Sequence, residues 1–204
     1  MLTPALALLT LLAGTAAAVV DATGRPGRGA LKMTAASGYL AFALALGAPG
    51  TPYGRFVLLA LLLSWAGDFF LLGDSRRSFV TGLAAFLLAH VAYAVAFTIA
   101  GVGASAMVGA AGMVVVGVVV LRWLLAAGLP TRMRIPVAAY LLAIAAMVAL
   151  AVGTGSPVVT TGAIAFAASD ILVARNRFVA PSPANRLVGL PLYFVAQLLI
   201  ASTV

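Results

Sequence analysis

The sequence predicts an all-α membrane protein, a polytopic bundle of about eight transmembrane helices. Of its 204 residues, 64% are hydrophobic and only 8% are charged, whereas soluble globular domains are about half apolar and about one quarter charged. Apolar stretches long enough to cross a bilayer alternate with short polar breaks along the chain. The basic residues gather in every second break. These three observations exclude a soluble enzyme.

Eight apolar stretches are the expected membrane spans, and the second is the shortest. At about 20 residues per span they use about 160 residues, which leaves no room for an extramembrane domain. We therefore expect residues 1–204 to form a single integral membrane helical domain. No Lys or Arg precedes the first stretch, so it lacks the basic region of a cleaved signal peptide and is expected to be retained. The spans expected are residues 3–20, 33–47, 56–72, 79–100, 103–121, 135–153, 158–174 and 187–204.

Several breaks between these stretches have the composition of turns. Residues 21–27, 49–52, 128–130 and 181–185 are rich in Gly, Pro, Asp and Asn. Glycine and proline inside the stretches, such as Gly82, Gly112 and Pro191, are tolerated in membranes, where small residues also favour close helix packing. The chain has no cysteine, which excludes disulfides, thiolate nucleophiles and iron–sulfur clusters.

The basic residues predict the orientation of the spans, because cytoplasmic loops carry an excess of Lys and Arg. The first, third, fifth and seventh breaks hold eleven basic residues, and the only other one in the chain is Arg55. The eleven are Arg25, Arg28, Lys32, Arg76, Arg77, Arg122, Arg132, Arg134, Arg175, Arg177 and Arg186. This alternation predicts a multi-pass protein of the cell membrane with both termini on the outer side. Basic residues spread singly in this way do not indicate a nucleic-acid partner.

A weaker regularity suggests that the chain contains two parallel halves of four helices. Asp68 closes the third stretch and Asp170 closes the seventh, 102 residues later, and Tyr93 and Tyr193 lie 100 residues apart. Low-complexity apolar sequence can produce such a spacing by chance, so both explanations stay open.

Asp68 and Asp170 are the only acidic residues inside the expected spans. An ionisable group there costs about 2.5–3.5 kcal/mol on insertion scales and needs a partner or a function. Both lie near the cytoplasmic ends of their helices, so they could face one another across a cavity. Two carboxyls in a partly dehydrated site do not ionise together easily, and one would keep a proton while the other acts as a base. That arrangement suits acid–base hydrolysis. Alternatively, each neutralises a nearby arginine, among Arg76, Arg77, Arg175 and Arg177.

His90 is the only histidine and lies in the fourth stretch, on a helical stripe with Phe86, Tyr93 and Phe97. It could carry a proton, because its pKa is the closest to neutrality, or it could be a hydrogen-bonded packing residue. Counting residues from the helix end places it about 10 Å deeper than the aspartates. A metal site built from Asp68, Asp170 and His90 has no supporting spacing motif, and no metal is expected.

Other polar residues flank the two aspartates. Tyr193 and Gln197 form a stripe with Gly189 on the eighth stretch, which could contact substrate or join helices. Ser64 and Ser169 lie beside the aspartates without the sequence context of a serine hydrolase. Arg175, Asn176 and Arg177 could bind a lipid phosphate, although cytoplasmic topology explains the arginines equally well.

Five segments together resemble the YhhN-type lysoplasmalogenase family of eight-helix membrane proteins. The resemblance covers the chain from about residue 60 to its end, and the first two spans add little to it. The segments are Gly-Asp-Phe-Phe-Leu-Leu at 67–72, Gly82, Phe-Leu-Leu-Ala-His-Val-Ala-Tyr at 86–93, Ser-Asp-Ile-Leu-Val-Ala-Arg-Asn-Arg-Phe at 169–178, and Leu-Tyr-Phe-Val-Ala-Gln-Leu-Leu-Ile at 192–200.

The resemblance implies hydrolysis of the vinyl ether bond of a lysoplasmalogen by water. The products would be a fatty aldehyde and glycerophosphoethanolamine or glycerophosphocholine. It implies that Asp68 and Asp170 are catalytic and that no cofactor is needed. The lipid chain would lie among the helices and the headgroup near the cytoplasmic arginines.

Two other functional classes remain open from the residues alone. A small transporter or a proton- or cation-binding protein would use intramembrane Asp and His side chains, but it predicts ionisable groups distributed through the whole depth of the bundle. A purely structural membrane protein would keep the aspartates for folding only.

Overall fold

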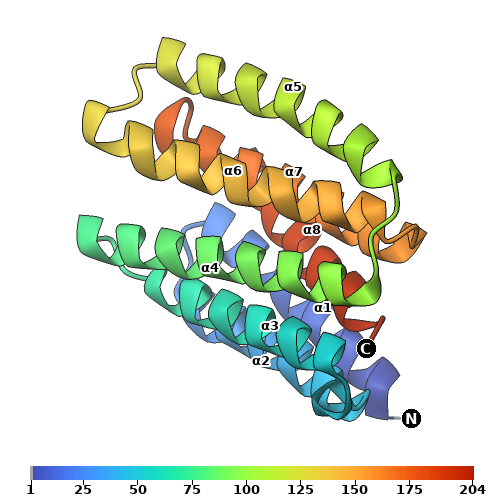
Figure 1. Cartoon of the computed structure of the whole chain (residues 1–204). Coiled ribbons are helices and arrows are strands. Elements are labelled where there is room, and N and C mark those ends of the chain that lie inside the picture. The colour runs from blue at the N-terminus through green and yellow to red at the C-terminus, as the bar shows by residue number, and fades with distance from the viewer. Residues whose placement is uncertain (1) are drawn as a thin grey trace.

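The computed structural model describes residues 2–204, which form eight long α-helices and one short 3₁₀ turn. Figure 1 shows the chain running back and forth between the two ends of a helical bundle. The helices are α1 (Leu2–Ala22), α2 (Arg28–Ala45), α3 (Pro52–Phe70), α4 (Arg76–Ala100), α5 (Ser105–Ala126), α6 (Thr131–Gly153), α7 (Pro157–Phe178) and α8 (Pro183–Ala201), with the turn η1 (Ala48–Gly50) before α3.

Seven of these helices are long and apolar enough to cross a membrane, which makes the chain a multi-pass membrane protein. The all-α prediction is confirmed. Helix α2 is the exception among the eight, and it corresponds to the shortest stretch in the sequence. It begins at Arg28, five residues earlier than expected. Lys32, which the sequence analysis counted with the basic residues of the first break, therefore lies inside a helix.

Local sequence explains where the helices begin and end. The side chains of Thr51, Ser75 and Ser156 accept hydrogen bonds from backbone N–H groups of the first turns of α3, α4 and α7. After α5, Gly128 adopts a φ of 87°, which a residue with a side chain rarely adopts. The breaks predicted from Gly, Pro, Ser and Asp thus become tight turns.

Sequential helices pair along the bundle, α1 with α2, α3 with α4, α5 with α6, and α7 with α8, and α8 also packs on α1 and α2. Glycine permits close approach between them. A Cβ at Gly67 of α3 would lie 2.6 Å from the ring of Phe86 on α4, and one at Gly162 of α7 would lie 2.7 Å from Ile200 on α8. In a membrane, where lipid is as apolar as the helix surfaces, such packing drives association.

The connections that follow α1, α3, α5 and α7 lie at the same end of the bundle (Figure 1). We call this end, which carries Arg25, Arg76, Arg132 and Arg186 among its residues, the basic end. Along the sides of the bundle, apolar side chains face outward, and α5 exposes Val108, Val114 and Val119. Such a surface suits contact with lipid chains.

Candidate active site

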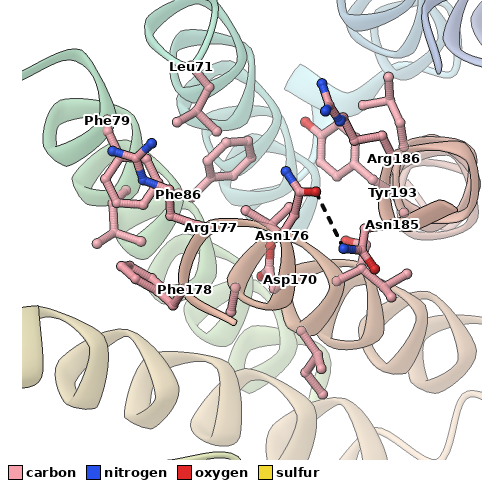
Figure 2. Close-up of a pocket in the computed structure, with 18 of the residues that line it drawn as sticks. Leu71, Phe79, Phe86, Asp170, Asn176, Arg177, Phe178, Asn185, Arg186 and Tyr193 are labelled. Carbon is pink, nitrogen blue, oxygen red and sulfur yellow. Dashed lines mark hydrogen bonds between the residues drawn. The ribbon is translucent and has the colours of Figure 1, made fainter. Parts of the chain in front are cut away.

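A cavity of about 550 Å³ opens among the helices near the basic end, and residues from all eight helices line it. Its size lies within the range of small-molecule pockets. Figure 2 shows part of the lining, with Asp170 and Phe178 from α7 and Arg186 and Tyr193 from α8. Both intramembrane aspartates, Asp68 and Asp170, belong to this lining.

Another part of the lining is apolar and comes from α4, α5 and α6. Its residues are Phe79, Leu83, Phe86, Val120, Leu124, Val137, Leu141 and Ile144. The cavity therefore joins polar and hydrocarbon-like surface in one space. A molecule with a long apolar chain and a polar group could occupy it, since each part would find a matching wall.

Asp68, which lies two residues before the end of α3, is held by a cation and two hydroxyl groups. The Nζ atom of Lys32, from α2, lies 2.9 Å from Oδ1. The hydroxyl of Tyr193, from α8, donates to Oδ2 at 2.7 Å, and that of Tyr39 donates to the same oxygen at 3.4 Å. Asp68 is only 1% exposed. The ammonium group compensates the charge of the carboxylate, which would otherwise be costly out of water.

Asp170, on α7, has a different set of neighbours. The Tyr140 hydroxyl, from α6, donates to Oδ2 at 3.1 Å. The Nε2 atom of His90, from α4, lies 3.2 Å from the same oxygen, off the line of a ring N–H, so the two atoms are in close contact without an aligned hydrogen bond. Neither Lys nor Arg forms an ion pair with Asp170 among residues 2–204.

The backbone determines how the His90 ring is protonated. Nδ1 lies 2.6 Å from the carbonyl oxygen of Phe86, which can only accept a hydrogen bond. Nδ1 therefore carries the proton of the neutral ring, and Nε2, the atom beside Asp170, has a free lone pair. The ring is completely buried and packs on Phe166 and Tyr140.

His90 contacts Asp170, although counting residues places its backbone about 10 Å deeper than the aspartates. His90 lies fourteen residues after the start of α4, and Asp170 lies eight residues before the end of α7. A residue count gives the height of the backbone only, so it does not decide whether two side chains from different helices meet.

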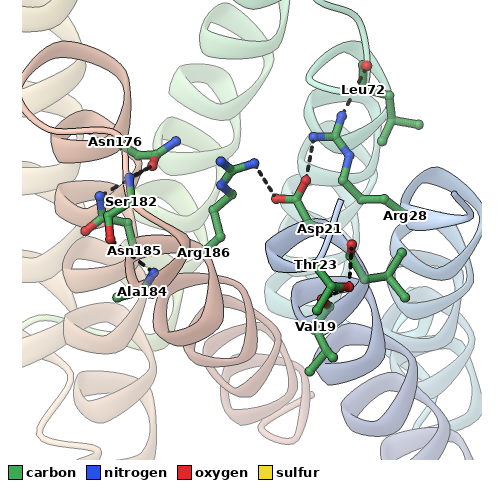
Figure 3. A network of polar contacts seen from close by, with 11 residues as sticks. Val19, Asp21, Thr23, Arg28, Leu72, Asn176, Ser182, Ala184, Asn185 and Arg186 are labelled. Carbon is green, nitrogen blue, oxygen red and sulfur yellow. Dashed lines mark hydrogen bonds and ion pairs between the residues drawn. The ribbon is translucent and has the colours of Figure 1, made fainter. Parts of the chain in front are cut away.

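At the basic end, Asp21 joins two arginines. Its Oδ1 lies 3.1 Å from Arg28, and its Oδ2 lies 3.1 Å from Arg186 (Figure 3). This cluster ties α1 and α2 to α8. All three residues line the cavity, and the Nε atom of Arg186 is buried without a hydrogen-bond partner.

The alternative explanation of the two aspartates, pairing with loop arginines, is not seen within residues 2–204. Arg175 donates to Asn185, and the guanidinium of Arg177 lies 4.5 Å from the centre of the Phe79 ring. Asn176 accepts hydrogen bonds from the backbone of Ser182 and the side chain of Asn185. These side chains organise the α7–α8 turn, while Lys32 and His90 partner the two aspartates.

The remaining predicted residues divide by their distance from the cavity. Tyr193 and Ser169 line it, and the Ser169 hydroxyl donates to the carbonyl of Phe166. Tyr93 donates to Gln197 in the buried core, outside the cavity lining. Ser64 is also completely buried there, and its hydroxyl has no hydrogen-bond partner among the residues that the structure describes. Within residues 2–204, no three His, Cys, Asp or Glu side chains gather as a group that could hold a metal ion.

Sequence reasoning missed three residues of this site, namely Lys32, Tyr39 and Tyr140. Lys32 was counted with the loop cations. Tyr39 and Tyr140 lie 101 residues apart, nearly the spacing of Asp68 and Asp170, and each donates to the aspartate on the following helix. The repeated spacing was therefore the signal that could have found both tyrosines.

Comparison with known proteins decides the family. The sequence model of the YhhN family matches residues 27–204, nearly nine tenths of the chain. The chain belongs to the YhhN family. No solved structure matches it significantly.

Curated relatives of this YhhN chain carry one common name. A protein of Mycobacterium bovis and one of Mycobacterium tuberculosis, both named lysoplasmalogenase, are 34% identical to it over 176 residues, which is 80% of this chain and 66% of each relative. The Sus scrofa protein named lysoplasmalogenase TMEM86B is 32% identical over 155 residues, 76% of this chain and 66% of that protein. The chain thus matches slightly less than two thirds of these relatives' length.

Proposed function

We propose that this YhhN protein is a lysoplasmalogenase, a membrane-embedded hydrolase that cleaves the vinyl ether bond of lysoplasmalogens. The observation that carries the proposal is the cavity itself, in which two aspartates with different partners and an apolar wall share one space. The names of the curated relatives support the same reaction. The products are a fatty aldehyde and glycerophosphoethanolamine or glycerophosphocholine.

The chemistry of a vinyl ether matches a site with two carboxyl groups. Protonation of the alkene carbon remote from the oxygen gives an oxocarbenium ion. Water then adds to the carbon next to the oxygen and forms a hemiacetal, which collapses to the aldehyde and the alcohol. One carboxyl supplies the proton, and the other stabilises the cation and accepts a proton from water. Asp68 and Asp170 are the groups that we assign to this chemistry, and no step requires a cofactor.

The orientation of the lipid follows from the chemistry of the lining. The alkenyl chain lies along the apolar wall formed by α4, α5 and α6, and the phosphate lies toward the basic end. Cytoplasmic loops of membrane proteins carry an excess of Lys and Arg, so the basic end lies on the cytoplasmic side of the cell membrane. The cavity then opens toward the cytoplasm, and both termini lie on the outer side. The chain acts as a single membrane domain, and the equivalent contacts Tyr39–Asp68 and Tyr140–Asp170 support its construction from two parallel halves.

The proposal predicts strict selectivity for the vinyl ether. We expect the detergent-purified protein to release fatty aldehyde from lysoplasmenyl-ethanolamine and to leave chain-matched 1-acyl and saturated 1-alkyl lysolipids intact, because neither has an alkene carbon to protonate. Gas chromatography of the derivatised aldehyde measures this. In D₂O, with the aldehyde reduced as it forms, the product carries one solvent deuterium on the carbon next to the former carbonyl. A folded protein that hydrolyses none of the three lipids would contradict the assignment and favour a transport function.

Arg186 is the side chain that we assign to the headgroup phosphate. Its side chain lines the cavity, and within residues 2–204 its one polar partner is Asp21, which holds Nη1, so the guanidinium keeps N–H donors for an anionic oxygen of a ligand. Arg175 and Arg177 are engaged with Asn185 and Phe79 and are less suited to this role.

Arg186→Gln is therefore expected to raise KM for lysoplasmenyl-ethanolamine by about tenfold, the value of one charge-assisted hydrogen bond. KM for the matched 1-alkenyl glycerol, which has no phosphate, is expected to stay within about threefold. Steady-state kinetics with both lipids check this. An equal rise of KM for both substrates would show that Arg186 shapes the cavity rather than binding phosphate.

A further inference from the structure

The two aspartates differ in the groups that surround their carboxyl oxygens, and this difference decides which of them can supply a proton. Around Asp68, Lys32 supplies a full positive charge at 2.9 Å, and two tyrosine hydroxyls donate to the other carboxylate oxygen. All three neighbours are hydrogen-bond donors. These donors occupy most of the acceptor sites of the carboxylate, and a proton added to it would face the Lys32 cation.

Asp170 is the opposite case. Because Nδ1 of His90 donates to the carbonyl of Phe86, Nε2 of the neutral ring carries no proton and is electron-rich, and it lies 3.2 Å from Asp170 Oδ2. An ionised carboxylate would place a second electron-rich atom against it, and the two would repel electrostatically. One proton on either atom removes the repulsion, as Asp170–COOH beside neutral His90 or as a carboxylate beside an imidazolium. In both forms the pair is electrically neutral and holds one proton that it can give away.

From this difference we infer that the Asp170–His90 pair is the general acid of the vinyl ether hydrolysis, and that Asp68, kept ionised by Lys32, is the carboxylate that stabilises the oxocarbenium ion and accepts the proton of water. His90 acts through Asp170, which is the group at the cavity. Lys32, Tyr39 and Tyr193 act through Asp68. The assignment rests on the proposed function and adds to it the separate role of each carboxyl.

The protons balance over one turnover. The Asp170–His90 pair gives its proton to the alkene carbon, the electron pair of the alkene forms the new C–H bond, and the cation is left beside the Asp68 carboxylate. Water adds to the cationic carbon while Asp68 takes one of its protons. On collapse of the hemiacetal, the hydroxyl proton returns to the Asp170–His90 pair, the C–O bond breaks, and Asp68 gives its proton to the departing glycerol oxygen. Both groups end as they began.

A cationic analogue tests the assignment without turnover. The probe is a lysophosphoethanolamine in which the group –CH₂–CH₂–NH₂⁺– replaces the vinyl ether, and its neutral control is the saturated 1-alkyl ether of equal length. Binding is measured by competition with a fluorescent ether lysolipid in detergent micelles. The ratio of the two dissociation constants reports the preference of the site for positive charge, and binding of the neutral ether reports that each variant is folded.

Asp68→Asn is expected to lower the preference for the cationic probe at least tenfold, because it removes the carboxylate and exposes the probe to Lys32. Asp170→Asn, which replaces an already neutral pair by a neutral amide, is expected to change that preference less than threefold. Should Asp68→Asn fold poorly, the double variant Lys32→Met/Asp68→Asn removes the ion pair as a neutral unit and is still expected to lose the preference for the cationic probe.

Loss of this preference in Asp170→Asn instead of Asp68→Asn, or in neither variant, would overturn the assignment. The expected binding pattern could also be found while the wild-type protein releases no aldehyde. That result would overturn the proposed function and leave the assignment of charge to the two aspartates standing.

Discussion

Asp170→Asn is expected to lower kcat for aldehyde release by about 10²–10⁴-fold, the usual value of a positioned general acid. Asparagine has nearly the same shape as a protonated aspartate and can still accept the hydrogen bond from Tyr140, but its amide cannot give a proton to carbon. The rate of aldehyde release at saturating lysoplasmenyl-ethanolamine measures the effect. KM is expected to change little, because in the proposed mechanism Asp170 acts at the reacting carbon rather than at the headgroup.

Asp74→Asn supplies the matched control. Asp74 is an exposed residue of the α3–α4 connection at the edge of the cavity lining, and none of the partners of Asp68 and Asp170 contacts it, so the substitution makes the same change of side chain, Asp to Asn, outside their polar contacts. Its kcat is expected to stay within about threefold of the wild type. If Asp170→Asn kept more than about one tenth of the wild-type kcat while Asp74→Asn behaved as expected, Asp170 would not be the acid.

Lys32→Met is expected to destabilise the protein by about 3–5 kcal/mol, the cost of leaving one buried charge without its partner. The side chains of Lys32 and Asp68 are only 11% and 2% exposed, so water cannot replace the lost ammonium group. Thermal unfolding in detergent measures the change. Lys32→Arg, which keeps the charge, is expected to retain most of the stability.

The double variant separates stability from chemistry. Lys32→Met/Asp68→Asn removes both charges and is expected to recover most of the lost stability, because a neutral amide replaces the unpaired carboxylate and keeps an acceptor for Tyr193. Its aldehyde release is expected to stay at least 10²-fold below the wild type. A double variant less stable than Lys32→Met would show that the two residues stabilise the bundle independently of one another.

The helices and the basic end could be predicted from the sequence, because both depend on short-range properties. The free energy of inserting a segment into lipid depends on the composition of that segment, and seven of the eight helices are apolar enough to show it. Helix α2 is the informative case. Its Lys32 weakens the apolar pattern, and the same Lys32 is the partner of Asp68. In the sequence, Lys32 is counted among the basic residues that indicate the cytoplasmic side, whereas in the structure it belongs to the candidate site.

The sequence by itself also singled out the ionisable residues of the candidate site, since Asp68, Asp170 and His90 are costly in a membrane and stand out in an apolar chain. Only the tertiary structure decided their partners. Whether Asp68 meets Lys32 or a loop arginine depends on how α2 and α3 are offset, and contact between His90 and Asp170 depends on the relative heights of α4 and α7. Packing between helices sets those offsets, and glycines such as Gly67 set how closely α3 and α4 approach. The hydropathy of a helix depends on its own residues, so the sequence reveals it. The partner of a buried charge depends on how two helices pack against one another, and only the folded bundle determines that.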